Sequence, residues 1–252
     1  MPEILLLIMG ISTHQKPRSL NKVQADGARW AAAGSRCILP ASMDSAALGE
    51  KMPDGLTSSI RTIHQCLRDS TQADHRRLES ALKLLDPQLT RDRYCRVLGA
   101  FHGFYAPLEA QFRHFRRSTT LTLGFALPRR AALLRADLEL LGWSPAASDD
   151  EPLREIQSIA EFAGRLYVVE GAALGGQVLA RSLARRWQLQ RNSGLAFFTG
   201  SGVLETGRRW ARVLTWLESV AQSGAKARDM VAAASATFRA LECRVVAQLG
   251  PS

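Results

Sequence analysis

The segment that decides the fold runs from Leu166 to Arg186 and reads LYVVEGAALGGQVLARSLARR. Its apolar residues follow helical spacing, yet Gly171, Gly175 and Gly176 fall where the helix should continue. Each glycine inside a helix costs about 1 kcal/mol relative to alanine, so three of them need a physical reason. A helix accepts them where it kinks, or where a flat partner lies directly against its backbone. We therefore expect a long helical segment that is interrupted only at these glycines.

A second segment lies about a hundred residues upstream and places a histidine on a helix face. Leu67–Glu79 reads LRDSTQADHRRLE, with His75 near its C-terminal end and Glu79 four residues further on. Side chains four residues apart share one face of a helix. A carboxylate that accepts the second ring N–H of a histidine fixes its tautomer and makes the imidazole a stronger metal ligand. We take His75 as a candidate axial ligand of a planar metal cofactor, held against the glycine-containing helix.

The same residues also allow simpler interpretations. A single histidine at a helical position is more often a surface or core residue than a ligand. Small residues spaced by four also permit two helices to cross closely without any cofactor. Among the other histidines, only His64, eleven residues before His75, lies on roughly the same helix face; the others are His14, His102 and His114. The glycine motif and an upstream histidine together favour the cofactor site.

These motifs resemble those of a known family. The pattern L-R-x-x-T-x-x-x-H-x-x-x-E in Leu67–Glu79 resembles the proximal helix of haem oxygenases. The run G-x-x-x-G-G-Q, from Gly171 to Gln177, resembles their distal helix. FFTGSGVLETGRRW, from Phe197 to Trp210, is similar to the segment before the last helices in the bacterial, phytochrome-associated branch. The resemblance covers roughly residues 60–245 and says nothing about the first 58.

The resemblance implies a reaction in which haem is both cofactor and substrate. It makes His75 the iron ligand, and it makes Gly171, Gly175 and Gly176 catalytic, because they let the helix backbone approach iron-bound dioxygen. The products would be biliverdin, carbon monoxide and free iron. The resemblance also implies an external electron donor, a ferredoxin or a flavodoxin-type reductase, and a bacterial phytochrome that receives the biliverdin.

Haem propionates are anionic and need cationic partners at the rim of the pocket. Arg68 lies seven residues before His75, two turns along the same face, and is the first candidate. Arg209 and Arg212 follow the FFTGSG segment and are further candidates, while Glu79 would orient His75. The alternative for each arginine is a solvated surface charge.

One position departs from the family pattern. In animal haem oxygenases an aspartate follows the first distal glycine and anchors a water network that protonates the bound oxygen. Ala172 stands at that position here. Either the proton path uses other waters, backbone groups or a different polar residue, or the protein binds or senses haem without turnover. A third hypothesis is a basic helical interaction protein whose glycines only pack helices.

The whole sequence is typical of an all-α protein with a single helical bundle. The 252 residues are 46% hydrophobic, and runs of β-branched residues with period two are missing. Residues 1–58 lack helical periodicity and are expected to form a poorly ordered N-terminal extension, with the helical domain in residues 59–252. Within that domain we expect helices over 60–85, 91–117 with a kink at Pro107, 128–141, 151–189 with the glycine interruption, 208–221 and 225–249.

Charge and cysteine usage exclude several function classes. The net charge is +10, but residues 59–252 carry 27 basic and 18 acidic side chains without a dense basic run. With no zinc-finger spacing and no aromatic RNA-binding pattern, we expect no nucleic-acid partner. No stretch reaches 18 consecutive apolar residues, so we expect no membrane span. The four cysteines show no ligand spacing and predict free thiols in the cytoplasm.

Overall fold

The structure is a computed structural model that describes residues 62–144, 153–189 and 193–250. These ranges are mostly helical and contain no strand. The helices are α2 (Ile63–Leu82), α3 (Arg91–Ser118), α4 (Arg130–Leu140), α5 (Ile159–Trp187), α6 (Ala196–Thr199), α7 (Val203–Gln222) and α8 (Ala227–Leu249). The predicted all-α class is confirmed for this part of the chain. The expected N-terminal extension, residues 1–58, lies outside the described residues.

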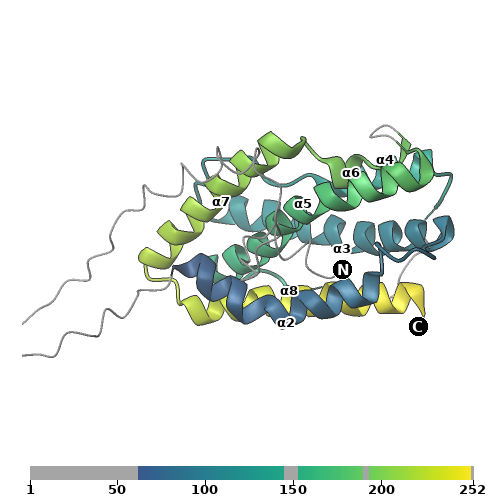
Figure 1. Ribbon diagram of the computed structural model, residues 1–252. Helices are drawn as coiled ribbons and strands as arrows, with labels where there is room; N and C mark the ends of the chain where they lie inside the picture. Colours follow the sequence, from purple (N-terminus) through teal and green to yellow (C-terminus); the bar gives the residue numbers. More distant parts are fainter. Residues whose placement is uncertain (1–61, 145–152, 190–192, 251–252) are drawn as a thin grey trace, which may run out of the picture. The chain divides into compact units, whose positions relative to one another are not determined.

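α5 runs through the middle of the view in Figure 1. It packs against α7 and α8, and its C-terminal half contacts α6. α2 lies alongside α8, while α3 packs on α4 and α8 (Figure 1). Buried apolar side chains from these helices form one core cluster, and the described helices belong to one compact unit. The predicted single helical bundle is therefore confirmed.

Local signals in the sequence explain where the first two helices begin. Thr62 and Gln65 form a capping box, in which each side chain accepts the other residue's backbone N–H at 3.2 and 2.9 Å. Thr90 caps α3 by accepting the N–H of Arg93 at 3.2 Å. Pro107 lies inside α3, and the helix continues past it to Ser118, as the periodicity predicted.

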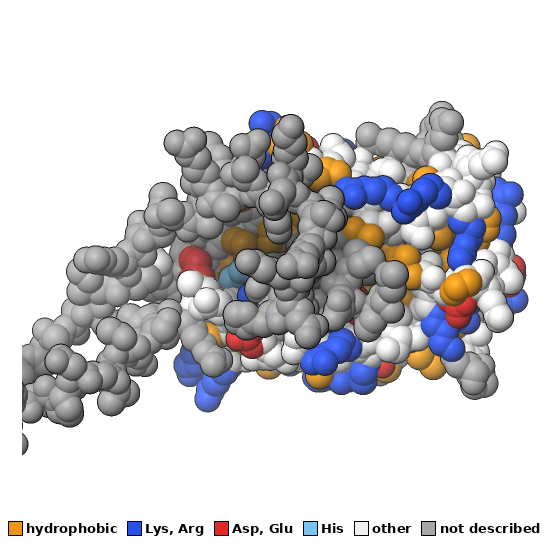
Figure 2. Space-filling view, in the orientation of Figure 1, with side chains coloured by type: hydrophobic (Ala, Val, Ile, Leu, Met, Phe, Trp, Pro, Cys, Tyr) orange, Lys and Arg blue, Asp and Glu red, His pale blue; other side chains and the backbone are white. Residues whose placement is uncertain are grey.

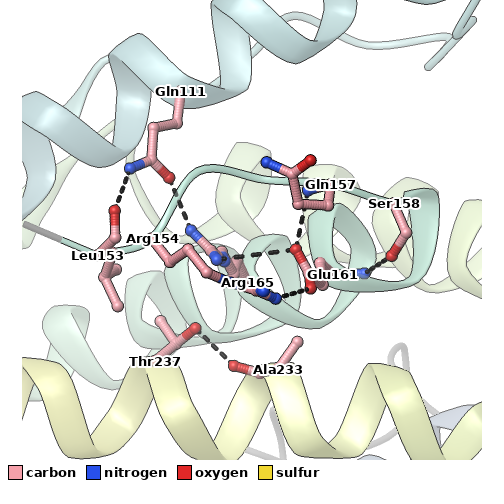
Figure 3. Close-up of polar contacts among 9 residues, drawn as sticks. All are labelled: Gln111, Leu153, Arg154, Gln157, Ser158, Glu161, Arg165, Ala233 and Thr237. Atoms are coloured by element: carbon pink, nitrogen blue, oxygen red, sulfur yellow. Dashed lines mark hydrogen bonds and ion pairs between the residues drawn. The ribbon is translucent and has the colours of Figure 1, made fainter.

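The N-terminus of α5 is fixed by a network of polar side chains (Figure 3). The Ser158 hydroxyl accepts the N–H of Glu161 at 3.1 Å, and the Glu161 carboxylate pairs with Arg154 at 2.6 Å. Arg165, which is buried, donates to the Gln111 side chain of α3 at 2.6 Å. These contacts begin the helix at Ile159, later than the predicted start near residue 151, because the capping serine stands at 158.

The predicted interruption of α5 at its glycines is wrong. The helix is continuous from Ile159 to Trp187, and at Gly164 and Gly176 the missing side chain allows a neighbouring helix to approach closely. Gly164, which the sequence analysis did not single out, shows this most clearly. A Cβ atom there would lie 2.2 Å from the carbonyl oxygen of Met230 in α8 and 2.9 Å from the Ala233 Cβ. The backbones of α5 and α8 can meet only because this position has no side chain.

Two buried carboxylates hold the N-termini of shorter helices. Glu109 of α3 accepts the first two backbone N–H groups of α4. Asp137 of α4 is fully buried and accepts the N–H groups of Ala196 and Phe197, both at 2.8 Å. A carboxylate at this place satisfies N–H groups that a helix cannot satisfy itself and interacts favourably with the positive end of its dipole. The cap explains why a helix of only four residues forms.

The structure also differs from the prediction between the helices expected over 151–189 and 208–221. α6 lies within that range, and α7 already begins at Val203. Gly200 and Gly202 adopt positive φ values of +46° and +87°, which glycine permits, and they separate the two helices.

Lysine and arginine side chains are spread over the visible face rather than gathered in one patch (Figure 2). Across the described ranges, no helix combines the length and the apolar character that crossing a membrane requires. Cys66, Cys95 and Cys243 carry free thiols, as predicted.

The close approach at Gly164 predicts that replacing this glycine with alanine lowers the free energy of unfolding. Gly164→Ala should destabilise the fold by about 1–3 kcal/mol, although alanine favours helices, because its methyl group collides with backbone of α8. Gly207→Ala is the matched control in α7: nothing lies within 4 Å of its added Cβ, so it should stabilise by up to about 1 kcal/mol. Urea unfolding followed by circular dichroism measures both. Equal stability of the two variants would contradict the close-approach argument.

Candidate functional site

A cavity lies among α2, α5 and α8, with side chains of α3 and α6 completing its wall. It contains about 630 Å³ of space that no atom fills, a figure that includes the part open to solvent. The described wall residues are His75, Leu78, Glu79, Leu82, Leu84, Phe101, Tyr105, Val168, Ala172, Gly176, Leu179, Phe197, Phe198, Phe238 and Leu241. Only three of these have polar side chains, so the cavity suits a mainly apolar ligand.

His75 and Glu79 form the polar end of the cavity on α2. His75 Nδ1 lies 3.5 Å from Glu79 Oε1, and the histidine side chain is 13% exposed. Burial lowers the pKa of His75, so the imidazole is neutral at physiological pH, the form that binds metals. Burial raises the pKa of Glu79 to about 7, and its Oε1 is buried without a hydrogen-bond partner. Glu79 therefore faces one ring nitrogen and leaves Nε2 available to a ligand.

The structure distinguishes His75 from His64, the other histidine considered as a ligand. His64 lies on the same helix but does not line the cavity. Its ring instead packs near Tyr167 and Trp210, with centroid distances of 6.3 and 5.9 Å. The described residues thus bring one histidine to the cavity, and it is the one that the motif singled out.

The glycines of α5 are not equivalent. Gly176 and Ala172 line the cavity, whereas Gly171 and Gly175 are buried next to them on the helix and are not wall residues. A Cβ at Gly176 would lie 3.1 Å from the carbonyl oxygen of Phe198, so this glycine also allows α6 to pack closely. Small residues therefore shape this face of the cavity and its contact with α6.

A glutamine that ends the glycine motif has a clear structural role. The Gln177 side chain donates a hydrogen bond to the carbonyl oxygen of Thr199 at 2.7 Å. This bond ties the C-terminal end of α6 to α5, while Asp137 holds its N-terminal end. Phe197 and Phe198 are thereby fixed in the cavity wall.

The three candidate arginines lie away from this cavity. Arg68 Nε is 3.0 Å from Asp69 Oδ1 on the surface of α2. Arg209 donates to both carboxylate oxygens of Glu170, at 2.6 and 2.7 Å, and Arg212 lies 3.0 Å from Glu205. None of the three lines the wall that contains His75.

A second, more open cavity lies on the other side of α5 and is called the outer cavity here. Its lining residues are Leu127, Pro128, Arg129, Arg130, Leu133, Glu170, Ala173, Gly200, Ser201, Glu205, Thr206 and Arg209. Glu170 is only 2% exposed although it carries a carboxylate, and Arg209 is its ionic partner. The sequence analysis missed Glu170. The available signal was an acidic residue inside an apolar run, directly before the glycine motif.

Comparisons with known sequences all point to one family. The Heme oxygenase family model matches residues 61–246. A heme oxygenase of Xanthomonas campestris pv. campestris (strain 8004) is 34% identical over 160 residues, which cover 64% of this chain and 93% of the relative. Heme oxygenase PigA of Pseudomonas aeruginosa is 34% identical over 143 residues, which cover 56% of this chain and 70% of the relative.

Solved structures show the same fold. The heme oxygenase of Neisseria meningitidis, determined with NO and CO bound, superposes with a TM-score of 0.62 at 17% identity and covers 76% of this chain and 94% of that one. The heme oxygenase of Leptospira interrogans gives a TM-score of 0.60 at 21% identity, over 73% and 98% of the two chains. From its sequence match over most of its length, this chain belongs to the haem oxygenase family.

Proposed function

We propose that this family member degrades haem, cleaving it to biliverdin, carbon monoxide and iron with dioxygen and reducing equivalents. The observation that carries the proposal is the apolar cavity in which a buried, neutral His75 lies opposite the small side chains of α5. When bound, haem supplies both the iron that activates dioxygen and the carbon that is oxidised.

The wall residues fit a haem. His75 offers a neutral ring nitrogen as axial ligand, and Glu79 has a buried oxygen that still needs a donor. The Nδ1–H of His75 can satisfy that oxygen, which would orient the ring and strengthen the ligand. Phe101, Phe197 and Phe198 provide flat apolar surface for the macrocycle.

The α5 side of the cavity is the proposed site of oxygen chemistry. Gly176 leaves the helix backbone without a side chain in the wall there, Ala172 adds only a methyl group, and Gly171 and Gly175 are buried beside them on the helix. Arg68 remains the first candidate for a propionate partner. Arg209 and Arg212 would have to leave Glu170 and Glu205 to take that role.

The proposal extends to partners. Turnover requires electrons from a donor such as a ferredoxin or a flavodoxin-type reductase, and the biliverdin would serve a bacterial phytochrome in the cytoplasm. The second candidate function is haem binding or sensing without turnover. It is favoured by one observation: the described wall of α5 carries no polar side chain, because Ala172 stands where animal enzymes have aspartate.

His75→Ala tests the iron ligand. The purified variant should still accept haem into the apolar cavity but lose the native Soret spectrum, and added imidazole should restore it. His64→Ala is the matched control on the same helix and should keep the native spectrum, since His64 lies outside the wall. The assignment is wrong if only the His64 variant changes the ligand field.

Gly175→Leu tests whether the α5 side of the cavity is the site of oxygen chemistry. A leucine at this buried position should push the helix or fill the oxygen site, so biliverdin formation should fall at least tenfold, equivalent to about 1.4 kcal/mol of barrier. Ala172→Asp is the control and should be tolerated. Circular dichroism and haem titration verify that the variants fold. Normal biliverdin formation by a folded Gly175→Leu variant would show that the glycines only pack helices.

A shortened chain that begins at Ser59 tests the proposed domain limits. Because the family match begins at residue 61, it should bind haem with the affinity of the full chain and show the same helical signal per folded residue. Isothermal titration and circular dichroism provide the comparison. A large loss of haem affinity would place residues 1–58 within the functional domain.

A further inference from the structure

The outer cavity has no part in the proposed haem chemistry. It contains about 760 Å³ of space that no atom fills, a figure that includes the part open to solvent. None of its described lining residues also lines the cavity of His75. Its wall combines segments that are far apart in the sequence: the start of α4 and the residues before it, the middle of α5, and the start of α7.

Both carboxylates of the outer cavity already have a cationic partner. Arg209 donates to the two carboxylate oxygens of Glu170, at 2.6 and 2.7 Å. Glu205 lies 3.0 Å from Arg212, which is not a lining residue. The acidic lining residues are therefore neutralised without the other two arginines of the wall.

Arg129 and Arg130 supply these two further positive charges. Among the described residues, neither guanidinium lies within 4.0 Å of a carboxylate oxygen. Arg130 donates one long hydrogen bond, of 3.4 Å, to the carbonyl oxygen of Phe197 and lies over its ring. The nearby Glu109 is outside the lining and accepts the first backbone N–H groups of α4. Two adjacent arginines without a carboxylate partner are suited to bind an anion.

The rest of the wall indicates which kind of anion fits. Its apolar part consists of Leu127, Pro128, Leu133 and Ala173. Ser201 and Thr206 add two hydroxyl groups. An inorganic anion would leave the apolar surface in contact with water, whereas an organic anion with an apolar body would cover it. The wall therefore favours a carboxylate that is attached to an aliphatic or aromatic group.

We propose that the outer cavity is a binding site for a small organic carboxylate. Arg129 and Arg130 donate N–H groups to the carboxylate, and its apolar body lies against Leu133 and Ala173. Each guanidinium can present two parallel N–H groups to a carboxylate, the geometry that makes arginine selective for this group. Arg209 stays with Glu170. The site is independent of haem degradation, because the two cavities have no described lining residue in common.

Benzoate is the probe for this site. It is titrated calorimetrically into the full-length protein after haem has been added to saturation, so that the cavity of His75 is filled. We expect one benzoate per chain. The double variant Arg129→Gln/Arg130→Gln should weaken binding at least tenfold. Ser201→Phe should also weaken it, because the larger side chain fills the cavity and leaves every charge in place.

Arg208→Gln is the matched control. Arg208 is an exposed arginine of α7 that does not line the cavity, so this variant should keep the affinity for benzoate. Circular dichroism verifies that all variants fold. Equal loss of affinity in the Arg208 variant, or unchanged affinity in the double variant, would overturn the site.

Two further probes test the class of ligand. Phosphate lacks an apolar body and should bind more weakly than benzoate, while benzylamine, with the same ring and a positive charge, should not bind. Phosphate binding as tight as that of benzoate would contradict an organic carboxylate site. Failure to bind haem would overturn the proposed function alone, because the titration can be repeated without haem and judged from the arginine variants.

Discussion

The close approach of α5 to its neighbours is the constraint on which the rest of the structure depends. At Gly164 the backbone of α5 meets a carbonyl oxygen of α8, and at Gly176 it meets a carbonyl oxygen of α6. A helix buried on several sides can be surrounded so tightly only where side chains are absent. Gly176 takes part both in the cavity wall and in the contact with α6, so the packing of α5 and the shape of the wall are connected at this residue.

The polar groups of the site form two separate sets. His75 and Glu79 lie together on α2, where one helix turn brings them onto the same face. Tyr105 lies on α3, and charged residues of α3, α4 and α5 act on it from behind. Apolar side chains fill the wall between these sets. The polar side chains of the wall therefore come from two different helices, α2 and α3.

The sequence was sufficient for features that depend on local spacing. The helical class, the passage of α3 through Pro107, and the pairing of His75 with Glu79 all follow from residues within a few turns. It was insufficient where distant residues decide. Glycine propensity suggested a break in α5, but burial against α8 and α6 keeps the helix continuous. The cap that Asp137 provides for α6 joins residues about sixty positions apart, so no local sequence pattern predicts it.

The way in which α6 is held determines how the shape of the cavity can change. Its two phenylalanines form part of the cavity wall, yet it is held by Asp137 of α4 and Gln177 of α5, neither of which lines the cavity. The pocket can therefore be reshaped by substitutions that never touch its ligand. A change at Asp137 or Gln177 would move Phe197 and Phe198, and with them the aromatic part of the cavity wall.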